Sequence, residues 1–359
     1  MRNLRHNKIS LAIFLALLGM TVKAAEPQPR PEFETDAIIR QQQRDDALQK
    51  QIQPDVNVNL GQPTASISAQ QLQYLKSHSE STCFEIKKIH LQGDDAAHFI
   101  STFNEITQGQ HNIIGRCLGV KGLNQALELV QNKIIADGYV TTRVLLPPQN
   151  IASGQLYVAV VVGRVDQVKF AKGTSARAHQ INALPIKSGD LLNIRDLEQG
   201  LENFKRVPTV DADFKIQPAE NNPTPGYSDV ILAWQQSKPY RINLSVDDAG
   251  SDSTGKYQGT ATLSLDHLLT LNDLFYISYN HDLGGGDSGK RGADGFYASY
   301  SIPFDYWLLS SSYSKSNYHQ TVAGASQSYE YSGKSELIGV DLSRVIYRDS
   351  HRKTTFGVG

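Results

Sequence analysis

Strict alternation of apolar and polar residues dominates the last third of the chain, after Lys238-Pro239. Between 240 and 247, for example, Tyr, Ile, Leu and Val alternate with Arg, Asn, Ser and Asp. A period of two indicates β-strands with one apolar and one polar face. Further alternating runs lie at 257–265, 275–280, 296–302 and 338–343. Each run is about ten residues long, which is the length that a tilted strand needs to cross a bilayer.

The connections between these runs alternate in length. Short turns are predicted at 268–270, 303–305 and 347–350, and long loops rich in Gly, Ser and Asp at 249–255, 282–294 and 317–333. Short turns on one side and long loops on the other are typical of an outer-membrane β-barrel. Aromatic residues gather at the short-turn end, as an interfacial girdle would: Tyr240, Tyr306, Trp307 and Tyr347. We therefore predict that 238–359 is the N-terminal part of a transmembrane antiparallel β-barrel.

Two points qualify the prediction of a membrane barrel. A soluble β-sandwich also alternates polar and apolar faces, so it remains the alternative. About six strands are predicted here, whereas membrane barrels have at least about eight and tolerate no open edge in lipid. We therefore expect the sequence to be part of a longer chain.

Before residue 238 the period changes, and helical patterns alternate with strands. The order is β-α-α-β-β in a first module, 81–162, and again in a second module, 163–237, so the fold class is α+β followed by membrane β. The first module has predicted strands at 84–91, 140–146 and 156–162 and helices at 96–107 and 122–136. The second has predicted strands at 165–170, 210–216 and 229–234, a short helix at 175–184 and a longer one at 194–204. Order and period repeat between the two modules, whereas residue identities do not.

The N-terminal region differs from both modules. Arg2, Arg5 and Lys8 precede an apolar run that ends near Met20, and Ala24 follows, so 1–24 is predicted to be a secretory signal peptide. A membrane anchor is the alternative, but the run is short for about 30 Å of hydrocarbon. Residues 25–52 begin with a proline-rich stretch and contain a very polar helix from 34 to 52. Residues 53–80 are predicted to be a linker.

Composition limits the chemistry. The net charge of −1 over 359 residues gives no argument for nucleic acid as a partner. In an exported chain, Cys83 and Cys117 are predicted to form a disulfide, with two buried thiols as the alternative. The histidines are scattered, so no metal site is predicted, and the glycine-rich segment 284–288 lacks the lysine of a phosphate loop. We predict no catalytic site and no cofactor.

Several motifs make the chain resemble a known family, the outer-membrane transporters of two-partner secretion, called TpsB or ShlB/FhaC/HecB type, within the Omp85 superfamily. The motifs are Gly138-Tyr-Val-Thr-Thr-Arg143, Leu146-Pro-Pro-Gln-Asn-Ile151, Gly163-Arg-Val165, Val246-Asp-Asp-Ala-Gly-Ser251, Tyr257-Gln-Gly259 and Cys117-Leu-Gly119. The resemblance implies that the two modules are polypeptide-transport-associated (POTRA) domains in the periplasm. It also implies that the polar helix is a plug in the barrel lumen, and that a conserved lumenal loop lies beyond residue 359.

The resemblance further implies a function. An unfolded exoprotein of haemolysin, adhesin or contact-dependent toxin type would be the client, secreted without ATP. Outer-membrane lipid, lipopolysaccharide and the barrel-assembly machinery would be further partners. A barrel-assembly insertase of the same superfamily is the alternative, and a soluble periplasmic binding module is another. An enzyme fits least.

An exposed strand edge in the first module is the predicted client site, because an extended chain can add to it through backbone hydrogen bonds. The candidates are Tyr139, Thr141 and Arg143 on the predicted strand 140–146 and its approach. The alternative is that this strand pair only forms core, as we expect for Val140 and Val144.

Overall fold

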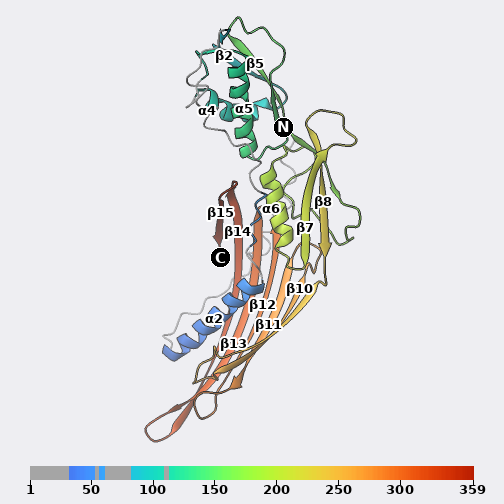
Figure 1. Cartoon of the computed structure of the whole chain (residues 1–359). Coiled ribbons are helices and arrows are strands. Elements are labelled where there is room, and N and C mark those ends of the chain that lie inside the picture. Colours follow the sequence, from blue (N-terminus) through green and yellow to red (C-terminus); the bar gives the residue numbers. More distant parts are fainter. Residues whose placement is uncertain (1–31, 53–55, 61–81, 109–112) are drawn as a thin grey trace, which may run out of the picture.

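A computed structural model describes residues 32–52, 56–60, 82–108 and 113–359. The predicted signal peptide and most of the predicted linker lie outside these residues. Figure 1 shows the order in space: the first module, then the second module, then a long curved sheet, with helix α2 (Glu32–Ile52) lying across the sheet.

The first module is a three-stranded sheet covered by helices. Its strands are β2 (Lys88–Gln92), β4 (Arg143–Leu145) and β5 (Gln155–Val161), in the order β2-β5-β4. Its helices are η1 (Ala96–Phe99), α4 (Ile100–Gln108) and α5 (Val120–Ala136). The core joins the apolar stripe of α5, including Leu123 and Ile134, to Leu156 and Val158 of β5. The predicted order of elements is confirmed, but the strand predicted at 140–146 is only Arg143–Leu145.

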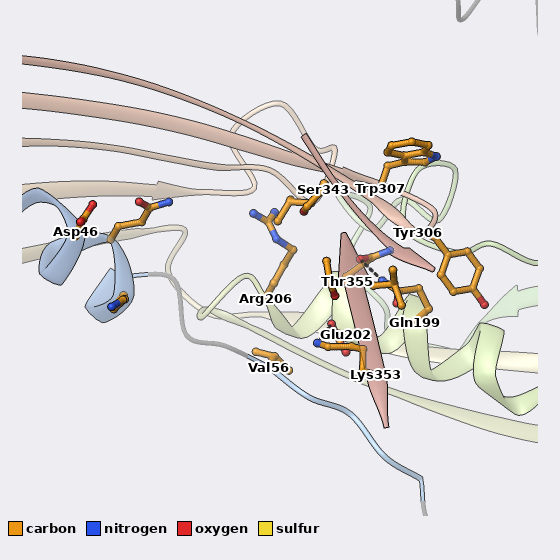
Figure 2. A pocket seen from close by; sticks show the side chains of 15 residues that line it. Asp46, Val56, Gln199, Glu202, Arg206, Tyr306, Trp307, Ser343, Lys353 and Thr355 are labelled. Carbon is orange, nitrogen blue, oxygen red and sulfur yellow. Dashed lines mark hydrogen bonds and ion pairs between the residues drawn. The ribbon is translucent and has the colours of Figure 1, made fainter. Parts of the chain in front are cut away.

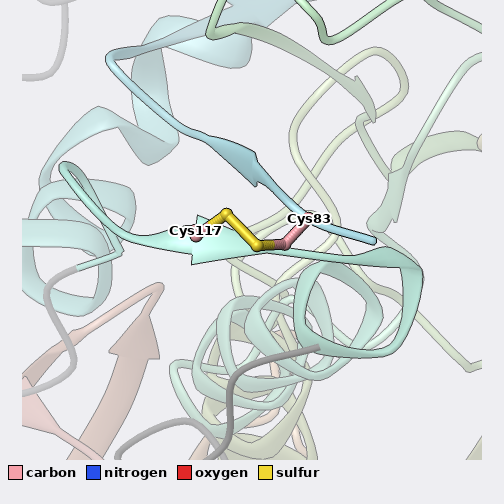
Figure 3. The surroundings of a disulfide bond; sticks show 2 residues. All are labelled: Cys83 and Cys117. Atoms are coloured by element: carbon pink, nitrogen blue, oxygen red, sulfur yellow. A yellow bond between two sulfur atoms is a disulfide. The ribbon is translucent and has the colours of Figure 1, made fainter. Parts of the chain in front are cut away.

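A small two-stranded sheet closes this module at one end. It pairs β1 (Phe84–Glu85) with β3 (Cys117–Leu118), and Cys83 and Cys117 are joined there by a disulfide (Figure 3). The Cα atoms of the pair lie 5.2 Å apart, within the usual range for a disulfide. A cross-link over a sequence separation of 34 residues restricts the unfolded chain and contributes about 3–4 kcal/mol in the loop-entropy picture.

The second module repeats the sheet but has a single helix in the described residues. Its strands β6 (Arg164–Phe170), β7 (Val210–Pro218) and β8 (Tyr227–Gln236) form a sheet in the order β6-β8-β7, and α6 (Ile194–Lys205) covers it. The short helix predicted at 175–184 is wrong, because this segment consists of turns. The side chains of Arg177 and Asn182 reach carbonyls of the large sheet, so contacts outside the module decide the conformation of this segment.

The large sheet has seven antiparallel strands that follow one another in sequence order. They are β9 (Tyr240–Asp247), β10 (Tyr257–Asp266), β11 (Leu274–Gly284), β12 (Gly292–Phe304), β13 (Trp307–Ala323), β14 (Ser328–Arg348) and β15 (Lys353–Val358). The alternation therefore predicted strands correctly but undercounted them. The loop predicted at 317–333 is mostly a hairpin that pairs as far as Ala323 with Ser328. Polar residues on both faces hid these strand ends from the period-of-two test.

The two faces of the sheet differ in chemistry. Ile242, Leu244 and Ile338 are exposed on one face, whereas Thr262, Ser278 and Asn280 are buried on the other. Helix α2 lies on this polar face (Figure 1). Among the helices of the described residues, none combines the length and apolar character that crossing a membrane requires.

Candidate functional site at the base of the sheet

Helix α2 is held on the polar face mainly by side-chain hydrogen bonds. Gln41 Nε2 donates to Asn280 Oδ1 at 3.3 Å, and Ser314 Oγ donates to Asp45 Oδ2 at 2.7 Å. Near the C-terminal end of α2, the apolar side chains of Leu48 and Ile52 pack against two tyrosines of the sheet, Tyr276 and Tyr297. A helix this polar finds suitable partners because the wall that it contacts is also polar.

Helix α6 connects the second module to the sheet through two different faces. Its apolar stripe, with Leu197, Leu201 and Phe204, packs into the cores of its own module. Its polar side chains are also buried, because they bind backbone groups in the turns of the large sheet. Asn203 Nδ2 donates to Asp305 O at 2.7 Å, and Arg206 Nη1 donates to Asn272 O at 2.9 Å. Burial lowers the pKa of Arg206 to about 10, so its guanidinium stays protonated at neutral pH.

Two carboxylates of α6 complete this connection. Glu202 accepts hydrogen bonds from Arg348 and, at 2.8 Å, from Lys353 Nζ, on either side of the turn between β14 and β15. Asp196 accepts a hydrogen bond from the hydroxyl of Tyr306, in the turn between β12 and β13. Burial raises the pKa of Asp196 to about 6, because the ionised carboxyl is poorly solvated there.

A cavity of about 440 Å³ lies between the end of α2, α6 and strands β13 to β15 (Figure 2). Side chains of both charge signs line it: Asp46 and Lys50 from α2, Glu202 from α6, Arg206 at the C-cap of α6, and Lys353 from β15. Trp307 adds an apolar surface. We call this space the mouth cavity. Small-molecule sites are usually lined mostly by apolar side chains, which the mouth cavity is not.

The predicted client-site residues are placed differently from the prediction. Tyr139 and Thr141 lie in turns before β4, and only Arg143 is on the strand, where it is exposed. The Tyr139 ring packs edge-on against Phe99, and its hydroxyl lies 2.7 Å from His98 Nε2. Tyr139 is therefore part of the packing of the first module, Thr141 lies close to Gly163 between the modules, and neither residue is on a strand edge.

A contact between the end of α5 and the start of α6 explains in physical terms why the Gly138–Arg143 motif begins with glycine. Ile194 N–H donates to Gly138 O at 2.9 Å, which links the start of α6 to the end of α5. Gly138 has φ near +102°, and a Cβ there would lie 2.1 Å from Asn193 Oδ1. Glycine is required by both the backbone conformation and the close approach.

The outer edge of β4 is closed by a side chain from α5. Gln131 Nε2 donates to Thr142 O at 2.9 Å, and Val144 N–H donates to Gln131 Oε1 at 2.8 Å. These two backbone groups are the ones that an added strand would use. This contact could not be predicted from the sequence, because a glutamine within a helix usually faces solvent.

A second glutamine explains the Pro147-Pro148-Gln149-Asn150 loop. The amide of Gln149 bonds both backbone groups of Tyr157 in β5, with Nε2 to O at 2.6 Å and N to Oε1 at 2.7 Å. Proline cannot donate a backbone hydrogen bond, so the Gln149 side chain pairs with β5 where β4 has ended.

The fold is therefore that of paired POTRA modules followed by a membrane-type antiparallel sheet. Three family models match the sequence: "POTRA domain, ShlB-type" over residues 84–163, "POTRA domain" over 164–218, and "Haemolysin secretion/activation protein ShlB/FhaC/HecB" over 226–359. The chain belongs to the ShlB/FhaC/HecB family of two-partner secretion proteins.

Curated relatives and a solved structure agree with this family. The "Outer membrane transporter CdiB-2" of Burkholderia pseudomallei is 34% identical over 93% of this chain and 58% of its own length. The "Outer membrane transporter CdiB" of Dickeya dadantii is 28% identical over 97% of this chain and 59% of its own length. The structure of CdiB from Acinetobacter baumannii superimposes with a TM-score of 0.78 at 28% identity, covering 92% of this chain and 62% of that one. The chain thus spans about three fifths of the length of these relatives.

Proposed function

We propose that the chain is the receptor and entrance part of an outer-membrane pore that secretes an unfolded exoprotein without ATP. The observation that carries this proposal is the joint placement of α2 and α6. One lies across the polar face of the membrane-type sheet, and the other fixes a POTRA module to the turns of the same sheet. A client bound by the modules is thereby delivered to the mouth cavity.

The different chemistry of the two faces of the sheet supports a proposal for what surrounds each face. The exposed apolar face, with Ile242, Leu244 and Val340, contacts outer-membrane lipid, and the polar face lines the passage. The POTRA modules stand in the periplasm. Lipopolysaccharide outside and the barrel-assembly machinery during insertion are further partners in this proposal, and α2 acts as a plug of the passage.

For client docking, β7 of the second module offers a better strand edge than β4. Ser237 N–H donates to Thr209 O, and Ala219 N–H donates to Tyr227 O, so odd-numbered residues of β7 face β8. The backbone groups of the even-numbered residues then face outward, and in the described structure the N–H groups of Ala212 and Ile216 have no hydrogen-bond partner. Strand β7 has nine residues, against three in β4, whose edge Gln131 closes. A docking role for Tyr139, Thr141 and Arg143 stays a prediction.

Site-specific photo-cross-linking tests the proposal. A benzophenone side chain replaces the exposed Asp213 in β7 or the exposed Arg143 in β4, in cells that export a large exoprotein through this protein. We expect adducts with the exoprotein at position 213 and few at 143. Adducts only at position 143 would favour β4 as the docking site. If the exoprotein is still exported but forms no adduct at either position, recognition by these strand edges is refuted.

Assembly and transport are measured in the same cells. The protein should fractionate with outer membranes, and deletion should leave the exoprotein in the periplasm. Export that continues at the same level in the deletion strain would refute the transport function itself.

A further inference from the structure

Residues 56–60, which follow α2 in the chain, lie against α6 without forming a helix or a strand. Three contacts hold them. Val58 packs on the core around Leu201 and Phe204, Leu60 N–H donates to Glu198 Oε1 at 2.9 Å, and Asn59 Nδ2 donates to Ser350 O in the turn between β14 and β15. The segment therefore touches the second module and the large sheet together.

The Glu198 carboxylate, which accepts the hydrogen bond from the Leu60 N–H, is unusually buried. The Glu198 side chain is 1% exposed, and its ion pair with Arg195 Nη1 at 2.6 Å is within α6 itself. A buried carboxylate requires strong hydrogen-bond donors, because its desolvation is costly. Its second donor is a backbone N–H, which almost any polypeptide can provide.

Two of the three contacts make little demand on the sequence, whereas the third requires the side-chain amide of Asn59. Asn57, Asn59 and Leu60 are exposed, and only Val58 inserts an apolar side chain into the module core. One small apolar residue and one N–H two positions later are enough to reproduce the backbone and core contacts. These are properties of extended chains in general and not of this segment alone.

A free acceptor lies next to this contact. Gln199 is 4% exposed and lines the mouth cavity, as does Val56 (Figure 2). Its Nε2 donates to Asn203 Oδ1 at 3.1 Å, whereas its Oε1 has no partner among the described residues. A longer or shifted chain on α6 could donate to this oxygen from the cavity.

We propose that Glu198 and Gln199, with the Val58 contact on the core, form an exchangeable binding site for an extended polypeptide, which we call the α6 seat. Residues 56–60 are its resident occupant. The competitor, an unfolded client segment, rests on the proposed transport function. Displacing residues 56–60 also frees the C-terminal end of α2. Val56 follows α2 closely in the chain, and the two apolar side chains that hold the helix on the sheet, Leu48 and Ile52, are at this end.

Thiol labelling of α2 tests the seat directly. The chain has two cysteines, both in the disulfide, so Ile52→Cys introduces a single reactive thiol at a side chain that is 4% exposed. The rate of its reaction with a water-soluble maleimide reports how often the base of α2 leaves the sheet. Leu60→Pro in this background removes the N–H that Glu198 accepts, and Asn57→Pro is the matched control, because the Asn57 N–H makes no hydrogen bond in the described structure.

We expect Leu60→Pro to raise the labelling rate about tenfold, since a hydrogen bond to a charged group is lost, and Asn57→Pro to change it by less than about twofold. A peptide with the sequence of residues 55–60, added to the otherwise unchanged Ile52→Cys protein, should raise the rate saturably. The same peptide carrying Leu60→Pro should not.

Equal rates in the two proline variants, or no response to the peptide, would show that residues 56–60 are a fixed tether and would overturn the proposal. The labelling needs no client and no secretion. A protein that responds to the peptide but exports nothing would therefore refute the transport function while leaving the α6 seat intact.

Discussion

Glu202 offers the sharpest test of how the second module is fixed to the large sheet. It pairs with Arg348 and Lys353, and the Arg348 side chain is 4% exposed. Glu202→Ala would leave the Arg348 guanidinium buried, with Nε and Nη1 already lacking partners in the described structure. Removing one partner of a buried ion pair costs about 3–5 kcal/mol. The partly exposed Lys353 can turn to solvent, so we expect about 3 kcal/mol, at the low end of that range.

Hydrogen exchange of the α6 amides measures this loss. If exchange in α6 requires separation from the sheet, about 3 kcal/mol corresponds to roughly hundredfold faster exchange at neutral pH, since about 1.4 kcal/mol is a factor of ten. Amides in the middle of β12 should keep their rates, because their hydrogen bonds lie within the sheet. The measurement uses the protein in detergent micelles, with mass spectrometry of peptides from α6 and from β12.

The matched control is Glu220→Ala. Glu220 also faces a lysine, with 3.7 Å between its Oε2 and Lys169 Nζ, but its side chain is 65% exposed. An exposed pair contributes at most about 1 kcal/mol, so exchange in α6 should stay within a factor of about five of wild type. Similar acceleration in both variants would mean that any lost carboxylate loosens the module. No acceleration in Glu202→Ala would mean that this ion pair does not fix α6, and either result would refute the reasoning.

Three further predictions concern other parts of the chain. Because the pKa of Asp196 is raised to about 6 in the folded protein, this carboxyl stabilises the fold most when it is protonated. The stability that it contributes should fall as pH rises from about 4 to about 6. Asp196→Asn should therefore make the melting temperature less dependent on pH over that range. Replacing Cys83 and Cys117 by serine should lower the stability of the first module by about 3 kcal/mol in urea unfolding followed by its amide exchange, and an unchanged midpoint would contradict this. Gln149→Ala should expose the Tyr157 backbone groups and speed exchange of that amide about tenfold, whereas Gln149→Glu should restore only the accepting half of the contact.

The sequence predicted the repeated elements well because burial forces their periods. In the large sheet, one face is apolar and the other polar, so residues such as Leu263 and Thr262 alternate and their strands can be read directly. The pattern failed at 317–333 because the hairpin there has no single apolar face. It failed again at 175–184, where Asn182 and Arg177 serve the neighbouring sheet and no helical stripe is needed.

The candidate site was much less predictable than the fold. Its parts come from α2, α6 and the strand turns, which are far apart in sequence, and their contacts are polar groups bound to backbone carbonyls. Such contacts produce no periodic pattern of apolar residues in the sequence. The strand edge of the first module was predicted from β-propensity, but the propensity of Val144 does not show that Gln131, thirteen residues earlier, already occupies its N–H.

The different attachments of α2 and α6 show which of the two can move. Helix α6 places Leu197, Leu201 and Phe204 in the core of its module, and such burial contributes about 1.5–3 kcal/mol for each side chain. Helix α2 buries Ile52 and part of Leu48, and its remaining described contacts with the sheet are side-chain hydrogen bonds that water can replace at a net cost near 1 kcal/mol each. Detaching α2 from the sheet therefore costs only a few kcal/mol, whereas detaching α6 from the core of its module costs far more. In the proposed transporter, α2 is therefore the element that an incoming chain would displace, while the module that receives the chain would stay in place, because the polar wall that a passage requires holds a helix only weakly.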